Sequence, residues 1–330
     1  MKAFCRNNRI SRFRVVVLTA IGLLFTKQLL LLQPPMMTSA ELEEPFESGG
    51  LFLKEVPLQK TTTSHYRWIW KEHQWMENLC KGGSRPSLLC HHVTVLPQQK
   101  VSFCLAAKVA STSIRDYFFK IAEGSLVIPD GARYGVHNAN WTRFAQLDPP
   151  TRKELLMSAE WTHVFFWKPV LDRFVSGYLD KVVNDCKKSN FMSDSNLAIK
   201  YYNQYGFSCE KHQDLESFVS FMEGVTAPRM EGHFAPQATL CGVEKFPYTD
   251  IIVANESLNA NLKVLSKKLG VEHPEKSQHT TSHKTGAKYE MISLFEGKQE
   301  LIGRILKLFE EDCKQIPKAC DVKNVRQLVK

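Results

Sequence analysis

Two short segments of the chain combine lysines with hydroxyl-bearing side chains, and this combination suits the binding of phosphate. In the first, backbone N–H groups at a helix start and three consecutive hydroxyls would hold one phosphate, with a lysine beside it. The segment is not a Walker loop, because GxxxxGK[ST] occurs nowhere in the chain. Taken alone, it fits an ordinary hydroxyl-capped helix start with a surface lysine better. Its residues are Lys108, Val109, Ala110, Ser111, Thr112 and Ser113.

The second segment begins where another apolar run ends. Lys168 ends that run, and Arg173 and Ser176 follow at a spacing that puts Ser176 one helical turn after Arg173 on the same face. The alternative is a solvated charged face made by Lys168, Asp172 and Arg173. Two phosphate sites that follow two strands of one sheet would imply a single ligand with two phosphates.

The elements that position these segments alternate between strands and helices. Ligands of open α/β sheets bind beyond the carboxyl ends of the strands, where both segments fall. The alternation predicts an α/β fold with a P-loop-like parallel sheet flanked by helices on both faces. The expected strands are residues 101–106, 161–167 and 250–254, and the expected helices are residues 114–122, 172–183, 258–269 and 289–313. An aromatic stretch at residues 66–75 is expected to begin the folded part as a helix.

The N-terminus predicts a membrane anchor. Five basic residues precede an apolar run at residues 15–32, which is close to the length of a spanning helix. This gives a cytosolic tail (1–14), a signal anchor (15–32), a stem rich in proline and hydroxyl residues (33–64) and a lumenal domain (65–330). The alternative is a cleaved secretory signal with an apolar part at residues 15–25 and a cleavage site near Ser39 and Ala40.

Both topologies place most of the chain in an oxidising compartment, where disulfides are the expected use of cysteine. Of nine cysteines, eight lie in the lumenal part, and their pairing cannot be deduced from the sequence. Cys104 lies in an apolar run and is interpreted as a buried thiol. No pair of CxxC motifs indicates zinc, and no metal is expected. The sequons at Asn140 and Asn255 are candidate glycosylation sites.

The formal charge of +9 and the pI near 9.0 favour an anionic partner. A nucleic acid ranks last, because the predicted topology keeps the basic domain away from it. A lumenal glycosyltransferase would share the topology, but no Asp-x-Asp pair for a metal and a nucleotide diphosphate occurs in the chain. Glu310 and Asp312 are interpreted as solvated charges on an amphipathic helix.

Three segments resemble the membrane-bound carbohydrate sulfotransferases of the chondroitin and dermatan type. Residues 107–113 are similar to the family's 5′-phosphosulfate loop, and residues 166–178 to its 3′-phosphate strand and helix. Residues 233–241 resemble its His-x-x-Pro-x-x-x-Leu-Cys segment, and the similarity extends through residues 248–258. The sequence departs from the family at Lys168, where arginine is usual, at Pro169, which comes one residue early, and near Cys241, where a second cysteine is missing.

The resemblance implies the sulfotransferase fold and transfer of a sulfuryl group from 3′-phosphoadenosine 5′-phosphosulfate (PAPS) to a glycan hydroxyl. The acceptor would be a chondroitin-like glycosaminoglycan, and the enzyme a single-pass type II protein of the Golgi membrane. Lys108 and the hydroxyls of residues 111–113 would bind the 5′ side of the donor, and Lys168 and Ser176 the 3′-phosphate. The departures at Lys168 and Pro169 keep open a non-catalytic lumenal protein that binds a glycan or nucleotide.

A base must accept the proton of the acceptor hydroxyl. His137, in the polar segment 134–140, is the favoured candidate, and an ordinary surface histidine is the alternative. His233 is the second candidate, although the resemblance assigns it to the wall of the site or to a structural role. A polar stretch containing His279, Ser282, His283 and Lys284 is expected to close over the nucleotide or to bind an acidic substrate.

Overall fold

A computed structural model of the chain describes residues 88–129, 135–187, 197–226, 229–274 and 287–321. The expected tail, anchor, stem and aromatic helix, and the polar stretch from His279 to Lys284, lie outside these residues. All the described residues belong to one compact unit, residues 61–330. Within them, no helix is long and apolar enough to cross a membrane.

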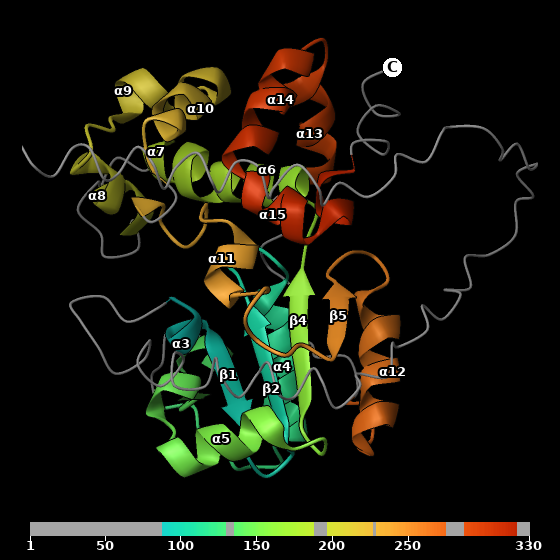
Figure 1. Cartoon of the computed structure of the whole chain (residues 1–330). Coiled ribbons are helices and arrows are strands. Elements are labelled where there is room, and N and C mark those ends of the chain that lie inside the picture. The colour runs from blue at the N-terminus through green and yellow to red at the C-terminus, as the bar shows by residue number, and fades with distance from the viewer. Residues whose placement is uncertain (1–87, 130–134, 188–196, 227–228, 275–286, 322–330) are drawn as a thin grey trace, which may run out of the picture. The chain divides into compact units, whose positions relative to one another are not determined.

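A five-stranded sheet forms the centre of this unit (Figure 1). Its strand order is β3-β1-β2-β4-β5, and β2, β4 and β5 run parallel as expected. The sheet as a whole is mixed, because β1 pairs antiparallel with both β2 and β3. The expectation of a parallel sheet is therefore corrected: a four-residue turn joins β1 to β2, and a turn this short can only join antiparallel strands. The strands are β1 (Val93–Leu96), β2 (Val101–Leu105), β3 (Thr142–Arg143), β4 (Thr162–Trp167) and β5 (Asp250–Val253).

Each parallel strand leads into a helix beyond the same edge of the sheet. Leu105 pairs with Phe166, and Trp167 pairs with Val253, so the carboxyl ends of β2, β4 and β5 lie next to one another. The helices that follow are α4 (Ser111–Ile121), α6 (Val170–Tyr178) and α12 (Leu258–Leu269). The loops after β2 and β4 are therefore neighbours in space, as the expected site requires.

Stacked aromatic rings fill the interior between the sheet and its helices. Phe103 of β2 lies parallel to Phe118 of α4 with 3.9 Å between ring centroids, and Trp141 meets Phe103 edge-on. Phe174 of α6 contacts Phe218 in the helical layer beyond the strand ends. Burial of such rings supplies the main free energy that holds α4 and α6 in place.

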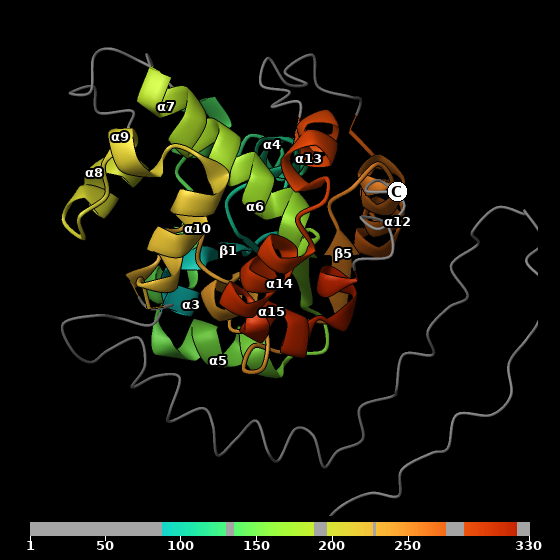
Figure 2. The same ribbon diagram turned by 90° about the horizontal axis from the view of Figure 1, so that it is seen from above.

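The C-terminal segment differs from the single helix expected at residues 289–313. It forms three helices, and the first break falls at Gly297, whose φ of +69° suits glycine. The three are α13 (Ala287–Phe295), α14 (Gln299–Leu308) and α15 (Glu310–Gln315). The first two pack on α6 in the layer toward which β4 points (Figures 1 and 2).

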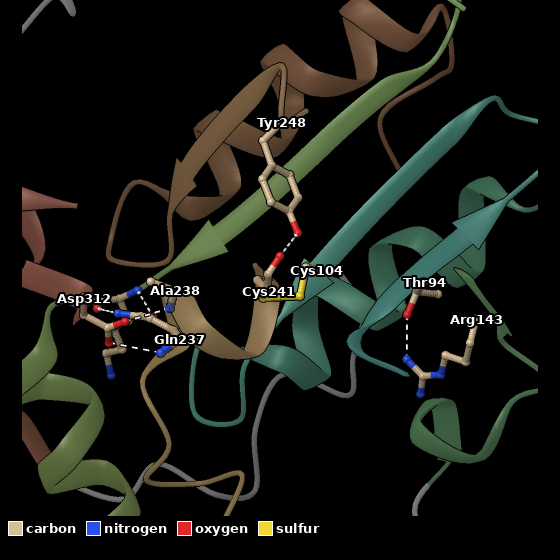
Figure 3. Close-up of a disulfide and its surroundings, with 9 residues drawn as sticks. Thr94, Cys104, Arg143, Gln237, Ala238, Cys241, Tyr248 and Asp312 are labelled. Atoms are coloured by element: carbon tan, nitrogen blue, oxygen red, sulfur yellow. Dashed lines mark hydrogen bonds between the residues drawn. A yellow bond between two sulfur atoms is a disulfide. The ribbon is translucent and has the colours of Figure 1, made fainter. Parts of the chain in front are cut away.

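Asp312 was expected on a solvated helix face, and the structure corrects this. Its side chain is fully buried and accepts hydrogen bonds from the backbone N–H groups of Gln237 (3.1 Å) and Ala238 (2.7 Å) (Figure 3). It therefore caps the start of α11 (Gln237–Cys241). Burial raises the pKa of Asp312, against the opposing effect of the Arg173 charge.

Three disulfides lie wholly within the described residues, which confirms the expected use of cysteine. They are Cys104–Cys241, Cys186–Cys209 and Cys313–Cys320, and Cys90 is disulfide-bonded as well. Cys104 is buried as expected, but the interpretation of it as a thiol was wrong, because it is bonded to Cys241. Its bond to Cys241 joins the end of β2 to α11, so it links the first phosphate loop to the His233 segment (Figure 3).

The remaining elements are short. The helices are α3 (Leu88–His92), α5 (Pro149–Met157), α7 (Asn184–Lys187), α8 (Leu197–Asn203), α9 (Cys209–His212) and α10 (Leu215–Glu223). Among the described residues, 3₁₀ turns cover Gly135–Asn138, Phe144–Gln146 and Pro317–Cys320, and a π-helical turn at Leu179–Val183 continues α6.

Candidate active site

The loop after β2 leaves the start of α4 open to an anion. Lys108 and Ala110 have φ values of +69° and +58°, a left-handed conformation that is unfavourable for residues with a Cβ. Ala110 is the N-cap of α4 and has no side-chain oxygen to cap the first N–H groups of the helix. The alternative of a hydroxyl-capped helix start is therefore not what forms. Val109 is buried in the core and anchors the loop.

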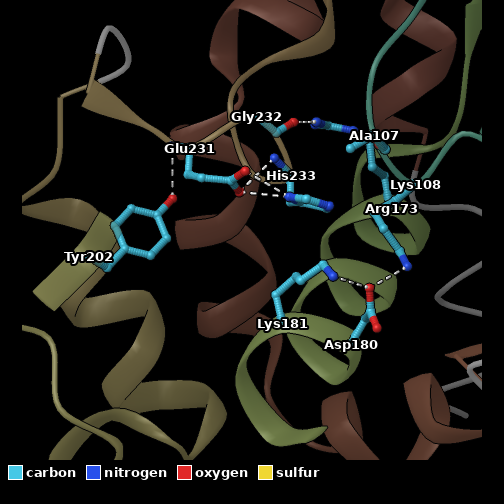
Figure 4. A network of polar contacts seen from close by, with 9 residues as sticks. All are labelled: Ala107, Lys108, Arg173, Asp180, Lys181, Tyr202, Glu231, Gly232 and His233. Atoms are coloured by element: carbon cyan, nitrogen blue, oxygen red, sulfur yellow. Dashed lines mark hydrogen bonds and ion pairs between the residues drawn. The ribbon is translucent and has the colours of Figure 1, made fainter. Parts of the chain in front are cut away.

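Lys108 is held by a carboxylate of the π-helical turn. Its Nζ lies 3.0 Å from Oδ2 of Asp180, and Nζ of Lys181 lies 3.1 Å from the same oxygen (Figure 4). Burial opposes the ionisation of Asp180, but the two lysine charges outweigh it and keep the pKa of Asp180 below its ordinary value. π-Helical turns occur frequently at functional sites. Here the turn places Asp180 and Lys181 beside the loop.

Arg173, expected to contact the donor, is 1% exposed and contacts two backbone carbonyls. Its Nε donates to the carbonyl of Ala107 (3.0 Å) and its Nη2 to the carbonyl of Gly232 (3.1 Å) (Figure 4). Burial lowers the pKa of Arg173, while the charges of Asp312 and Glu231 raise it. These contacts tie the phosphate loop to the segment that carries His233.

Lys168 directly follows β4, in the short loop that leads to α6. Its backbone N–H donates to Oε1 of Gln237 (3.1 Å), and its carbonyl accepts from Nε2 of the same amide (2.7 Å). Burial lowers the pKa of the Lys168 ammonium group; Asp172 raises it, and the Lys108 charge lowers it again. Because β2 and β4 are neighbouring parallel strands, the loops that carry Lys108 and Lys168 leave the sheet side by side. Ser176 lies on α6 and is 6% exposed.

His137 lies against the phosphate loop. Its Nε2 is 2.9 Å from Oγ1 of Thr112, so the favoured base and a loop hydroxyl meet although 25 residues separate them. The residue is exposed, but its ring nitrogens are partly desolvated; this desolvation lowers the pKa of the imidazole to about 4, and the Arg115 charge adds to the effect. The ring is therefore neutral near pH 7 and able to accept a proton.

His233, the second candidate, forms a dyad with Glu231. The Nδ1 of His233 lies 2.8 Å from Oε1 of Glu231, and the backbone N–H of Glu231 donates to the Tyr202 hydroxyl (3.1 Å) (Figure 4). Burial opposes the ionisation of Glu231, but the hydrogen bond and charge of His233 keep its pKa below the ordinary value. Sequence reasoning missed Glu231 and Asp180, because neither shows its partner in the linear pattern.

Within the described part of the chain, no three histidine, cysteine or acidic residues gather as a metal site would require. The candidate glycosylation sites, Asn140 and Asn255, are both exposed. Oδ1 of Asn140 accepts from the backbone N–H of Val127 (2.7 Å), and Oδ1 of Asn255 accepts from that of Ser257 (3.0 Å). Their glycosylation stays a prediction.

The fold is α/β with a mixed sheet, and cationic loops follow two neighbouring parallel strands. This arrangement suits a ligand with two phosphates. Residues 91–315, more than half of the chain, match the sulfotransferase family. The chain belongs to this family, which implies sulfuryl transfer from PAPS to a glycan. Neither the curated proteins nor the solved structures include a match.

The residues present fit the donor that the family implies. An uncapped helix start and Lys108 suit a phosphosulfate, and Lys168, directly after the neighbouring strand β4, suits a second phosphate. The match over residues 91–315 supports the sulfotransferase family and leaves the chondroitin and dermatan type as a prediction.

Proposed function

We propose that the chain transfers a sulfuryl group from PAPS to a hydroxyl of a glycan, with a chondroitin-like glycosaminoglycan as the acceptor. The observation that carries this proposal is that Lys108 and Lys168 lie in the loops after the neighbouring parallel strands β2 and β4, beside the uncapped start of α4. Two cations at adjacent strand ends match a nucleotide with phosphates at both its 3′ and 5′ positions. Family membership supplies the reaction class.

The loop residues hold the reacting end of the donor in this proposal. The N–H groups and hydroxyls of residues 111–113 bind the 5′-phosphosulfate, with the backbone of Val109 and Ala110 shaping the turn. When the S–O bond to the phosphate breaks, negative charge grows on the bridging oxygen, and Lys108 neutralises it. Lys168 and Ser176 bind the 3′-phosphate. Arg173 acts as a positioning residue, through the carbonyls of Ala107 and Gly232.

Proton transfer is assigned to His137. As the acceptor oxygen forms its bond to sulfur, its proton passes to the neutral imidazole. The contact with Thr112 keeps the ring beside the loop that would hold the sulfate. The Glu231–His233 dyad is the second candidate, because it reaches the same loop through the Arg173 bridge.

We also propose that the protein is a type II Golgi membrane protein anchored by residues 15–32, with its catalytic domain in the lumen. The disulfides and the exposed sequons at Asn140 and Asn255 support this location. A protease-protection assay on intact microsomes tests it. Digestion of residues 65–330 without detergent would contradict the proposal.

Transfer of radiolabelled sulfate by the full-length protein tests the activity. We expect the wild type to label at least one acceptor among chondroitin, dermatan, heparan and N-glycan, and Lys108→Ala to abolish labelling. Equal labelling by Lys108→Ala and the wild type would remove the mechanism. The matched control is Lys314→Ala, because Lys314 is an exposed lysine of α15 that takes no part in the proposed site.

A second candidate function is a non-catalytic binding protein derived from a sulfotransferase. The point charge of Lys168, in place of a bidentate arginine, favours it. This protein would bind 3′-phosphoadenosine 5′-phosphate (PAP) without transferring sulfate to any acceptor in the screen. Transfer to a single defined acceptor excludes it.

A further inference from the structure

Two arginines lie beside the candidate active site and are not used by the proposed reaction. Arg115 is on α4, one turn after the phosphate loop, with its guanidinium carbon 5.5 Å from the centroid of the Trp141 ring. Arg143 is on β3, and its Nη1 donates to Oγ1 of Thr94 (2.7 Å) (Figure 3). Arg143 follows Trp141 by two residues, so both arginines lie beside the same short segment. Burial lowers the pKa of Arg115 to about 10, and the Arg143 charge adds to this effect.

The two arginines have no acidic partner within the described residues. Nε and Nη1 of Arg115 are buried and make no hydrogen bond there. Burial, followed by the charges of Arg143, His91 and Arg115, lowers the pKa of nearby His92 to about 4. A pair of partly buried like charges is unfavourable unless an anion joins it. An anion that joins the pair would therefore stabilise it.

The strand order places this pair on the acceptor side of the site. A donor gripped by the loops after β2 and β4 would run from β2 toward β5, with its sulfate at the β2 end. The strands on the other side of β2 are β1 and β3, and these carry Thr94 and Arg143. His137 contacts Thr112 on this same side. Trp141 connects the arginine pair to the segment of His137, because its ring lies against Arg115 and its Nε1 donates to the carbonyl of Val136 (2.7 Å).

We propose that Arg115 and Arg143 bind an anionic group of the acceptor, a carboxylate or a sulfate ester on the sugar next to the one that is sulfated. This inference rests on the proposed function and adds a recognition site to it. Planar guanidinium groups suit both anions, because each offers paired N–H donors to two oxygens. The site would select acidic glycans over neutral ones and fix which hydroxyl faces His137.

Binding of three hexasaccharides to the full-length protein tests the proposal without requiring turnover. The first is unsulfated chondroitin, which carries carboxylates alone; the second is sulfated and carboxyl-reduced; the third is unsulfated and carboxyl-reduced, and so neutral. We expect at least one acidic ligand to bind about tenfold or more tightly than the neutral one. We expect Arg115→Gln and Arg143→Gln each to remove most of this preference while leaving PAP binding unchanged.

The matched control is Arg229→Gln, since Arg229 is exposed and its guanidinium carbon lies 6.0 Å from the centroid of the Tyr205 ring. It should keep the wild-type preference. Equal binding of all three glycans by the wild type would overturn the proposal, as would an unchanged preference in folded Arg115→Gln and Arg143→Gln proteins. If these variants fail to fold, binding of the three glycans by the wild type still tests whether the protein prefers an acidic acceptor. Absence of PAP binding alone would contradict the proposed function and leave the glycan preference as a separate result.

Discussion

Lys108 and Asp180 form an ion pair across two elements, with 3.0 Å between Nζ and Oδ2. The carboxylate positions the lysine and also places a negative charge beside the proposed phosphosulfate site. We predict that Asp180→Asn binds PAP several-fold more tightly, because an anion-repelling charge is lost, and turns over about tenfold more slowly, because Lys108 is no longer held. PAP titration and single-turnover sulfate transfer measure the two effects. Weaker PAP binding in Asp180→Asn would contradict this role, and Glu296→Gln, at an exposed glutamate, is the charge-matched control.

Lys168 is predicted to act on donor binding more than on the chemical step. Its charge would face the 3′-phosphate, which does not react, so Lys168→Ala should raise the KM for PAPS about tenfold or more with little change in kcat. Lys168→Arg should keep the wild-type KM or lower it, because a guanidinium contacts phosphate at two points. A fall in kcat with an unchanged KM in Lys168→Ala would place this lysine at the reacting end instead.

The pH dependence of turnover distinguishes the two candidate bases. The pKa of His137 is lowered to about 4, so its imidazole is neutral above that pH and becomes protonated below it. We predict that kcat stays level from pH 7 down to about 5 and falls as the pH approaches 4. His137→Ala should lower kcat about a hundredfold and remove this limb. An unchanged limb in His137→Ala would favour the Glu231–His233 dyad, and His91→Gln, at an exposed histidine, serves as the control.

The disulfide between Cys104 and Cys241 is predicted to contribute more stability than that between Cys313 and Cys320. The first spans 137 residues and the second spans 7, and a cross-link that closes a longer loop restricts the unfolded chain more. Replacing both cysteines of a pair by alanine should lower the free energy of unfolding by ~2–3 kcal/mol more for the first pair. Urea unfolding under oxidising conditions measures this. Equal losses for the two pairs would show that strain or residual structure governs instead.

Much of the fold could be predicted from the periodicity of the sequence. The expected strands at 101–106, 161–167 and 250–254 match β2, β4 and β5 to within one residue, and the helix at 258–269 matches α12. β1 was missed, and with it the antiparallel half of the sheet, because its pairing depends on a neighbouring strand. The single C-terminal helix was wrong, because the left-handed turn at Gly297 interrupts a pattern that otherwise continues.

The sequence could indicate the two loops of the candidate site, but not the contacts that their residues make with distant parts of the chain. Types and spacing singled out Lys108, Lys168 and His137, and the structure brings His137 within hydrogen-bonding distance of the loop residue Thr112. The roles of all three in binding and catalysis stay predictions. The carbonyl contacts of Arg173 could not be foreseen, because they depend on Gly232, 59 residues away. Likewise, Asp312 was interpreted as solvated because its amide partners lie 74 and 75 residues away.

The most direct test of the account is the affinity of the full-length protein for PAP compared with adenosine 5′-phosphate, which lacks the 3′-phosphate. If Lys108 binds the 5′-phosphate and Lys168 the 3′-phosphate of one nucleotide, PAP should bind about a hundredfold more tightly than adenosine 5′-phosphate. Lys168→Ala should remove most of that difference. Equal affinity for the two nucleotides, or no binding of either, would contradict the account.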